Sequence, residues 1–243
     1  HLSGGDVLRH HLARHHVVGQ HGLELGLAAT ADGDGNARFG ERQRDRPSDA
    51  RAAARHQRDL ACQINQILHL SPESNRVFLS AWEQWKVPKD HFLVREKEVA
   101  DYIFFIKKGV ARIYYYKNGE EITEWIAMDE QFFLSITSFF QRTPSHLIVQ
   151  VIEPSDVLGI HYNNLIKLAG QYHDVETLFR KMMTGSLILS QQRMDSIQFE
   201  TAHQRYGKLI KETPGIVQRV PLSYIASFLG VTLETLSRIR SGK

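Results

Sequence analysis

Hydrophobic positions between about residues 91 and 160 fall in short runs of β-forming residues, which predicts a series of strands. The pair Asn118-Gly119 is the strongest turn signal among them, because both residues tolerate positive φ at a hairpin. The strands are expected over residues 102–106, 110–116, 121–126, 147–152 and 156–160. Short strands with regular turns are typical of an antiparallel β roll or a jelly-roll-like barrel.

The pattern becomes helical on both sides of this region. Before it, Ser71-Pro72 is a helix start, and the apolar stripe that follows predicts a helix ending at Pro88. After it, a long helix is predicted over residues 173–199. Its apolar positions recur at three- and four-residue steps and form a seam: Val175, Leu178, Met182, Gly185 and Leu189. This seam is compatible with packing inside the chain and with a dimer interface, and periodicity leaves both open.

The end of the chain has the pattern of two short helices joined by a tight turn. Gly230 fits the corner because it has no Cβ to clash at positive φ, and Leu236 and Ile239 fit the buried side of the second helix. A polar, cation-bearing helix on a compact support is typical of a recognition helix that reads DNA. The candidate DNA-binding residues are Thr232, Glu234, Thr235, Ser237, Arg238 and Arg240.

Residues 62–243 resemble the Crp/Fnr (catabolite-activator/fumarate-nitrate-regulator) superfamily of bacterial transcription regulators, and residues 224–239 carry the most specific part of the resemblance. It implies an α+β fold with a β roll, flanking helices, a long dimerisation helix and a C-terminal helix-turn-helix. It also implies a cytoplasmic homodimer that binds palindromic double-stranded DNA, with RNA polymerase as a further partner. Glu234 and Arg238 stand at base-contacting positions, where a carboxylate accepts from cytosine and a guanidinium binds guanine. Leu233 stands where many members carry a further Arg, so their DNA specificity does not transfer.

The resemblance implies an effector site in the roll as well. Members that bind cyclic nucleotides usually have a Gly-Glu pair, followed by an Arg-Ser or Arg-Ala pair for the cyclic phosphate. Here Leu134-Ser135 and Ser145-His146 occupy those approximate positions, with Arg142 nearby. We therefore expect an unidentified small-molecule effector and weak or no binding of cyclic AMP. The chain ends three residues after Arg240, where many relatives continue into a wing, so a minimal or truncated DNA module is expected.

The composition changes near residue 60. Residues 1–59 contain nine Arg but no Lys, Ile, Tyr, Trp or Cys, so a disordered or non-native extension is expected there. An effector domain is then predicted over residues 60–172, the dimerisation helix over 173–199 and the DNA-binding domain over 200–243. The net charge of +3 permits an anionic partner, and the sequence has no apolar run of membrane-spanning length. The single Cys62 excludes an intrachain disulfide and a Cys-rich metal site.

Two other functions stay open at this point. A cupin-type metalloenzyme uses a similar β roll, but it needs a His-x-His pair and a Glu to hold its metal. His91, His146 and His161 are isolated in the sequence, so neither a metal site nor catalytic residues are predicted. A module that binds a cyclic nucleotide or another small molecule without DNA activity is favoured only if the terminal helices are inaccessible.

Overall fold

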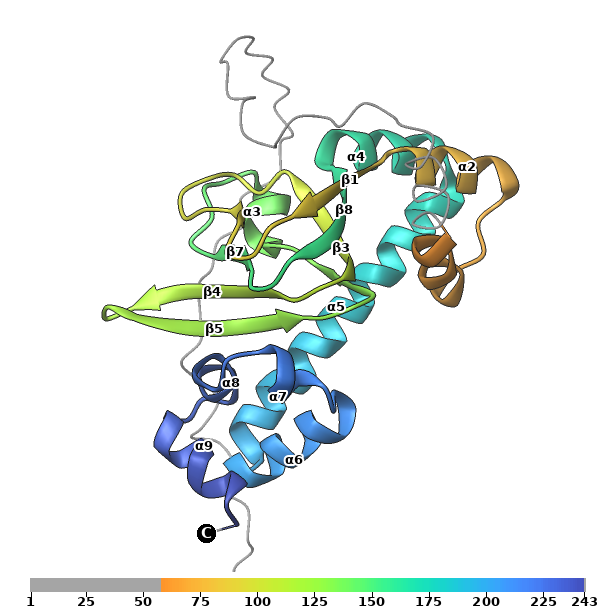
Figure 1. Cartoon of the computed structure of the whole chain (residues 1–243). Coiled ribbons are helices and arrows are strands. Elements are labelled where there is room, and N and C mark those ends of the chain that lie inside the picture. Colours follow the sequence, from red (N-terminus) through yellow and green to blue (C-terminus); the bar gives the residue numbers. More distant parts are fainter. Residues whose placement is uncertain (1–57, 243) are drawn as a thin grey trace, which may run out of the picture. The chain divides into compact units, whose positions relative to one another are not determined.

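The structure is a computed structural model that describes residues 58–242. Two four-stranded antiparallel sheets form a β roll, as the sequence predicts (Figure 1). The first sheet has the strand order β1-β8-β3-β6 and the second has the order β2-β7-β4-β5. The strands are β1 (Trp82–Val87), β2 (Phe92–Val94), β3 (Tyr102–Lys108), β4 (Ala111–Lys117), β5 (Glu120–Ala127), β6 (Gln131–Phe133), β7 (Ile148–Val151) and β8 (Ser155–His161).

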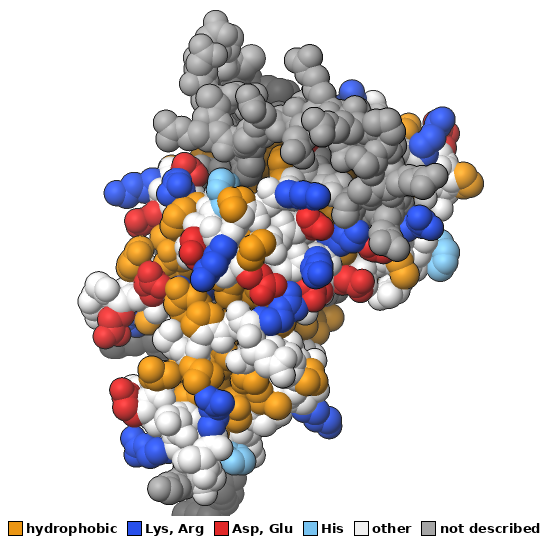
Figure 2. Space-filling model, viewed as in Figure 1, with side chains coloured by type: hydrophobic (Ala, Val, Ile, Leu, Met, Phe, Trp, Pro, Cys, Tyr) orange, Lys and Arg blue, Asp and Glu red, His pale blue; other side chains and the backbone are white. Residues whose placement is uncertain are grey.

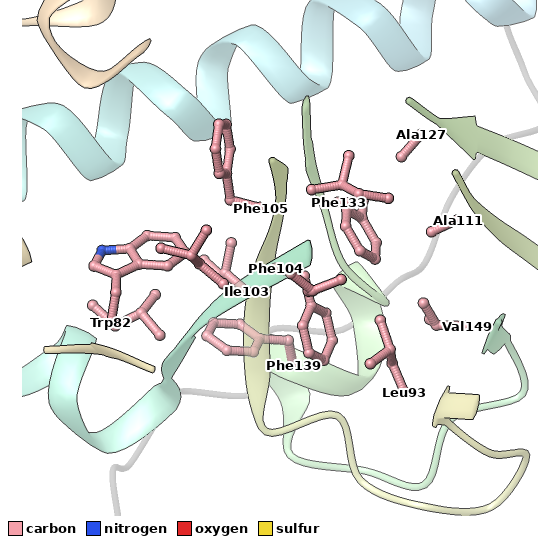
Figure 3. Packing of buried hydrophobic residues seen from close by; sticks show 14 of the residues in the cluster. Trp82, Leu93, Ile103, Phe104, Phe105, Ala111, Ala127, Phe133, Phe139 and Val149 are labelled. Carbon is pink, nitrogen blue, oxygen red and sulfur yellow. The ribbon is translucent and has the colours of Figure 1, made fainter. Parts of the chain in front are cut away.

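The core of the roll lies between the two sheets, where buried apolar side chains from both of them gather (Figure 3). Phe104 and Phe133 stack with their ring centroids 5.4 Å apart. Phe139, from helix α3 (Ile136–Gln141), has no exposed surface. Fully burying such a side chain contributes about 1.5–3 kcal/mol. The aromatic cluster therefore stabilises the roll as one unit.

Residues 82–87 correct the sequence prediction. Helix α2 (Pro72–Ser80) begins at the expected cap, where the Ser71 hydroxyl accepts from the Ser74 amide at 3.2 Å, but it ends at Ser80. The residues that follow form β1 and pair with β8. Trp85 packs across the strands, with its ring centroid 5.2 Å from that of Tyr102. Aromatic residues suit a half-buried pleated surface, and this pairing outweighs their helical spacing.

Helices continue the chain from the roll to the C-terminus (Figure 1). They are α4 (Tyr162–Gln171), α5 (His173–Phe199), α6 (Ala202–Glu212), α7 (Ile216–Arg219), α8 (Leu222–Leu229) and α9 (Leu233–Arg240). Helix α5 has the bounds that the helical pattern predicts. It packs on α2 and α4 beside the roll, and near its other end Arg193 contacts Phe228 of α8.

The apolar seam predicted along α5 lies mostly on the side that packs within the chain. Val175 and Leu178 have no exposed surface, so these two residues are intrachain core, which corrects their assignment to a dimer interface, whereas Met182 is partly buried against the core of the roll. Gly185 is partly exposed, and only Leu189 is clearly open, at 51%. The physical reason is that α5 carries two apolar stripes, and a three-four spacing does not tell which one faces the chain's own roll.

The structure describes two residues of the extension that the sequence predicts. Residues 58–67 are helical, and Leu60 and Ile64 are fully buried. Asp59 forms an ion pair with Lys107 of β3, at 3.1 Å. The last two residues of the expected extension over residues 1–59, Arg58 and Asp59, are therefore helical. The rest of the extension lies outside the described residues. Within residues 58–242, no helix is both long enough and apolar enough to cross a membrane.

Candidate nucleic-acid interface and effector region

Helices α8 and α9 form the helix-turn-helix that the sequence predicts. Gly230 adopts φ 69° and ψ 36° at the end of α8, and the Val231 amide returns to the Ala226 carbonyl at 3.0 Å. Thr232 caps α9, its hydroxyl accepting from the Thr235 amide at 3.2 Å. Leu236 is fully buried against α8 and its neighbours. The corner and the buried side of α9 fix which of its residues face outward.

The outward face of α9 is open and polar. Thr232, Glu234, Ser237, Arg238 and Arg240 are exposed, and Thr235 is half-buried. The amide of Glu234 itself, followed by the Thr232 hydroxyl, holds the pKa of the Glu234 carboxyl below its usual range. Glu234 is therefore an anion at neutral pH and can accept from a base, while the two arginines can donate to bases or phosphates.

Helix α8 is not free but lies along β5 of the roll, as Figure 1 shows. The Ser227 hydroxyl accepts from the Thr123 amide at 2.8 Å and donates to the Glu121 carbonyl at 3.1 Å. One serine therefore takes the place of a neighbouring strand at the edge of the sheet. It satisfies one donor and one acceptor that β5 would otherwise present to solvent.

A buried arginine joins the same two elements. Arg112 of β4 is 1% exposed, and its guanidinium lies 3.7 Å from the ring centroid of Tyr224 on α8 and 4.2 Å from that of Tyr114. It donates to the Thr123 hydroxyl at 2.8 Å and to the Glu121 carboxylate at 2.6 Å. The Arg112 guanidinium is shielded from water, lies against two aromatic rings and donates through both Nε and Nη1. Such a buried, charge-assisted arrangement is a strong contact. Arg112 belongs to the attachment of α8, not to an effector site.

The predicted effector residues surround α3, between β6 and β7. The hydroxyls of Ser135 and Ser145 are buried and lie 2.9 Å apart. Ser145 also bonds the amide and the carbonyl of Leu147, at 3.0 and 2.8 Å. Leu134 is half-buried against the apolar core, and His146 is exposed. The two serines come together, but they bond one another and the backbone, so this region presents little free polar capacity.

Arg142 is committed to partners on neighbouring elements. It ends α3 with φ 54°, donates to the Ala100 carbonyl at 2.9 Å and forms an ion pair with Asp101. Its guanidinium lies 4.4 Å from the ring centroid of Tyr162. Arg112 is the one charged side chain that is buried among residues 58–242, and it is committed to α8. The roll interior that is described here therefore offers no cation for a cyclic phosphate.

Several contact residues carry no signal in the sequence. Arg112, Ser227 and Arg193 read there as ordinary members of a strand and two helices, and their partners lie far along the chain. Of this interface, the sequence predicts only the two helices α8 and α9 from their amphipathic pattern. Within the described residues, no group of three or more His, Cys, Asp or Glu side chains is placed to hold a metal ion.

Comparison with known proteins finds one family model that is similar to the roll. Residues 84–172 match the family model described as "Cyclic nucleotide-binding domain". The description of this model is that of a binding domain, so the match gives no support to a cupin-type enzyme. No curated protein matches the chain significantly.

Solved structures share the fold over a larger part of the chain. FixK2 from Bradyrhizobium japonicum is 22% identical with a TM-score of 0.57, and the match covers 66% of this chain and 83% of that one. A protein described as a Crp/Fnr-family transcriptional regulator, from Eubacterium rectale, is 16% identical with a TM-score of 0.57, covering 71% and 83%. The c-di-GMP-responsive global regulator CLP of Xanthomonas campestris is 12% identical with a TM-score of 0.54, covering 71% and 91%. Residues 84–172 are thus similar to a cyclic nucleotide-binding domain, and the chain shares the fold of FixK2 and of the Crp/Fnr-family regulator from Eubacterium rectale.

Proposed function

We propose that this protein is a DNA-binding transcription regulator of the Crp/Fnr type that acts in the bacterial cytoplasm. The observation that carries the proposal is the geometry of α9, which is capped at Thr232, buried through Leu236 and open on the face of Glu234 and Arg238. A helix held in this way can enter the major groove with its polar side chains on base edges. RNA polymerase is a further partner that we propose for such a regulator.

The proposed assembly is a homodimer through α5. On this helix Leu187 and Met194 are seven residues apart, the heptad spacing of a two-stranded coiled coil, and Ile197 follows three residues later. Leu187, Met194 and Ile197 are 70%, 50% and 49% exposed. Leu187 and Met194 form the open stripe, on the side of α5 opposite to Leu178, which is buried in the chain itself. A two-fold axis along α5 relates two copies of α9 and favours a palindromic site.

The proposed effector is a small molecule other than cyclic AMP. The family match supports a ligand in the roll, whereas the side chains around α3 argue against a cyclic phosphate. Ser135 and Ser145 bond each other, and Arg142 is paired with Asp101. Binding would shift the chain between conformations with different DNA affinity.

A selection from random-sequence duplex DNA with the full chain tests the DNA-binding function. Sequencing of the bound fraction should show a palindrome whose half-sites lie about one helical turn apart, roughly 34–36 Å. The selection is run with and without a cell extract that can supply the effector. Enrichment of no motif under either condition contradicts the proposal. Binding of a small molecule from the extract without DNA enrichment supports a sensor module instead.

A further inference from the structure

We infer that Arg219 is a positioning residue for DNA binding: with Asp129 and Glu153 it holds the helix-turn-helix against the roll in the orientation that binds DNA. Arg219 is the last residue of α7, directly before the helix-turn-helix, and both acidic partners lie in turns of the roll. The inference rests on the proposed DNA-binding function and adds how the reading helix is placed.

The guanidinium of Arg219 uses nearly all of its donor capacity on the two carboxylates. Nη1 and Nη2 donate to the two oxygens of Asp129 at 2.7 and 2.9 Å, in a two-pronged arrangement. Nε donates to Glu153 at 3.1 Å, and Nη2 also bonds the same Glu153 oxygen. Such a planar fork fixes direction as well as distance, which a lysine cannot do. The three side chains are only about a quarter to under a half exposed.

Both partners of Arg219 also have bonds within the roll, Asp129 through its carboxylate and Glu153 through its backbone carbonyl. The Gly109 amide donates to Asp129 at 2.7 Å. Gly109 has φ 132°, and a Cβ built there would lie 1.9 Å from the Ser155 hydroxyl, so only glycine allows the turns to approach this closely. The Ser155 hydroxyl in turn donates to the Glu153 carbonyl at 2.8 Å. Three turns at one end of the roll therefore form a preorganised acidic receptor for Arg219.

A shared apolar core lies behind this ion-pair cluster. On its roll side are Val110, Ile126, Met128 and Ile152, and on its C-terminal side are Ile216, Val220, Ile225, Ala226, Leu229 and Leu236. All of these residues are at most 8% exposed. The C-terminal helices complete their core with residues of the roll. The contact with the roll therefore sets the orientation of the C-terminal helices. At the polar edge of this contact, Arg219 fixes how the helices are aligned on the roll.

The docked arrangement leaves the functional surfaces free. The polar face of α9 with Arg238 is exposed, and so is the stripe of α5 around Leu187. The face drawn in Figure 2 shows hydrophobic side chains gathered over the C-terminal helices and below the roll, with Lys and Arg side chains around them. Since docking covers neither the reading face nor the dimer stripe, we assign it to the state that binds DNA.

A double substitution on the roll separates this role from a direct DNA contact. In Asp129→Asn with Glu153→Gln, Arg219 is kept but its partners lose their charge. Long-range electrostatics alone predicts tighter DNA binding, because two negative charges are removed. Loss of positioning predicts the opposite, roughly three- to tenfold weaker binding of the selected palindrome. Glu96→Gln with Glu120→Gln is the matched control, since it removes two exposed carboxylates of the roll away from Arg219.

Docking itself is read by amide hydrogen exchange in the full chain without DNA. The Thr123 amide, which donates to Ser227, should exchange faster in the double variant and unchanged in the control. Arg219→Lys should give an intermediate DNA affinity, because it keeps the charge and loses the fork. Unchanged or tighter DNA binding by the double variant overturns the inference. If the wild-type chain selects no DNA, the proposed function fails and the inference fails with it, while exchange at Thr123 still reports whether the ion pairs hold the two parts together.

Discussion

The guanidinium of Arg193 lies 3.9 Å from the ring centroid of Phe228 and donates to the carbonyl of the same residue at 2.8 Å. Arg205 of α6 donates to the next carbonyl, that of Leu229, at 3.0 Å. These carbonyls belong to the last turn of α8, where a helix has acceptors without partners of its own. Burial lowers the pKa of Arg193 to about 10, so it still carries its charge at neutral pH. Two arginines from neighbouring helices thus fix the corner that precedes the reading helix.

The first prediction is that Arg193→Met destabilises the protein. The variant keeps most of the apolar stem but leaves the Phe228 carbonyl without its charged donor. A hydrogen bond to a charged group is worth about 1.5–3 kcal/mol, so a loss near the lower end of that range is expected in urea unfolding. Arg180→Met is the control, since its pair with Glu176 is exposed and it should change stability by less than about 0.5 kcal/mol. Equal effects of the two substitutions contradict the assigned role.

Local patterns predict the helix-turn-helix well, because its determinants lie within a few residues of each other. Gly230, the cap at Thr232 and the burial of Leu236 all depend on local spacing, and all are found. Local patterns fail where a partner far along the chain decides the secondary structure. Trp82 and Trp85 have helical spacing, yet β8 draws them into a sheet.

The contacts between the roll and the C-terminal helices show the same limit. Ser227 meets Thr123 across more than a hundred residues, and Arg219 meets Asp129 across 90. No period in the sequence encodes such a pairing. Residue type alone gives little help, because an arginine on a short helix is usually solvated. These contacts become visible only when the turns of the roll are placed in space.

The second prediction concerns assembly. Leu187→Glu with Met194→Glu places like charges along the open stripe of α5 and should convert a dimer to a monomer in light scattering. Leu189→Glu is the control for Met194→Glu. It introduces one charge at a site that is 51% exposed, against 50% for Met194, but lies on the other side of the helix, so the dimer should persist. If Leu189→Glu alone dissociates the dimer, the interface lies on the side of Leu189 that the sequence predicts. A monomeric wild type at micromolar concentration excludes both seams.

The third prediction is a pH dependence at Asp129. The hydrogen bonds from Arg219, supported by the Gly109 amide against the effect of burial, hold the pKa of this carboxyl below its ordinary value of 3.8. Because the folded-state pKa is the lower one, the ion pair stabilises the fold fully above that ordinary value, and its contribution disappears as the pH falls through the folded-state pKa. Asp129→Asn should therefore cost stability near neutral pH, about 1 kcal/mol or less for such a half-exposed pair.

Urea unfolding of the wild type and Asp129→Asn, from about pH 7 to about pH 3, measures this dependence. The gap between the two curves should be constant down to the ordinary carboxyl pKa and close below it. Asp101→Asn is measured for comparison, because it removes a carboxylate that pairs with Arg142 and lies outside the contact between the roll and the C-terminal helices. A gap that widens toward acid pH contradicts the assignment of the lowered pKa to Arg219.

The fourth prediction is that cyclic AMP binds weakly or not at all. A buried cyclic phosphate needs a charge-assisted partner worth roughly 1.5–3 kcal/mol, and the side chains around α3 do not supply one. Arg142 is held by Asp101 and the Ala100 carbonyl, so Arg142→Ala should lower thermal stability and leave the cyclic AMP titration unchanged. Isothermal calorimetry measures both proteins. Low-micromolar affinity that is lost in Arg142→Ala shows that this arginine turns inward to bind the phosphate.

The last prediction separates base reading from phosphate contact on α9. Arg238 and Glu234 are exposed one turn apart, and the first can bind a guanine through two donors. Arg238→Ala should cost about 1–3 kcal/mol on the selected palindrome and relax the preference at one guanine in each half-site. Arg240 lies nearer the end of the helix and is expected on phosphate, so Arg240→Ala should weaken all sequences alike and reduce the salt dependence. Repeating the selection with each variant distinguishes the two roles. If Arg238→Ala leaves the enriched motif intact while affinity falls uniformly, Arg238 contacts the backbone and sequence is read by other residues of the helix.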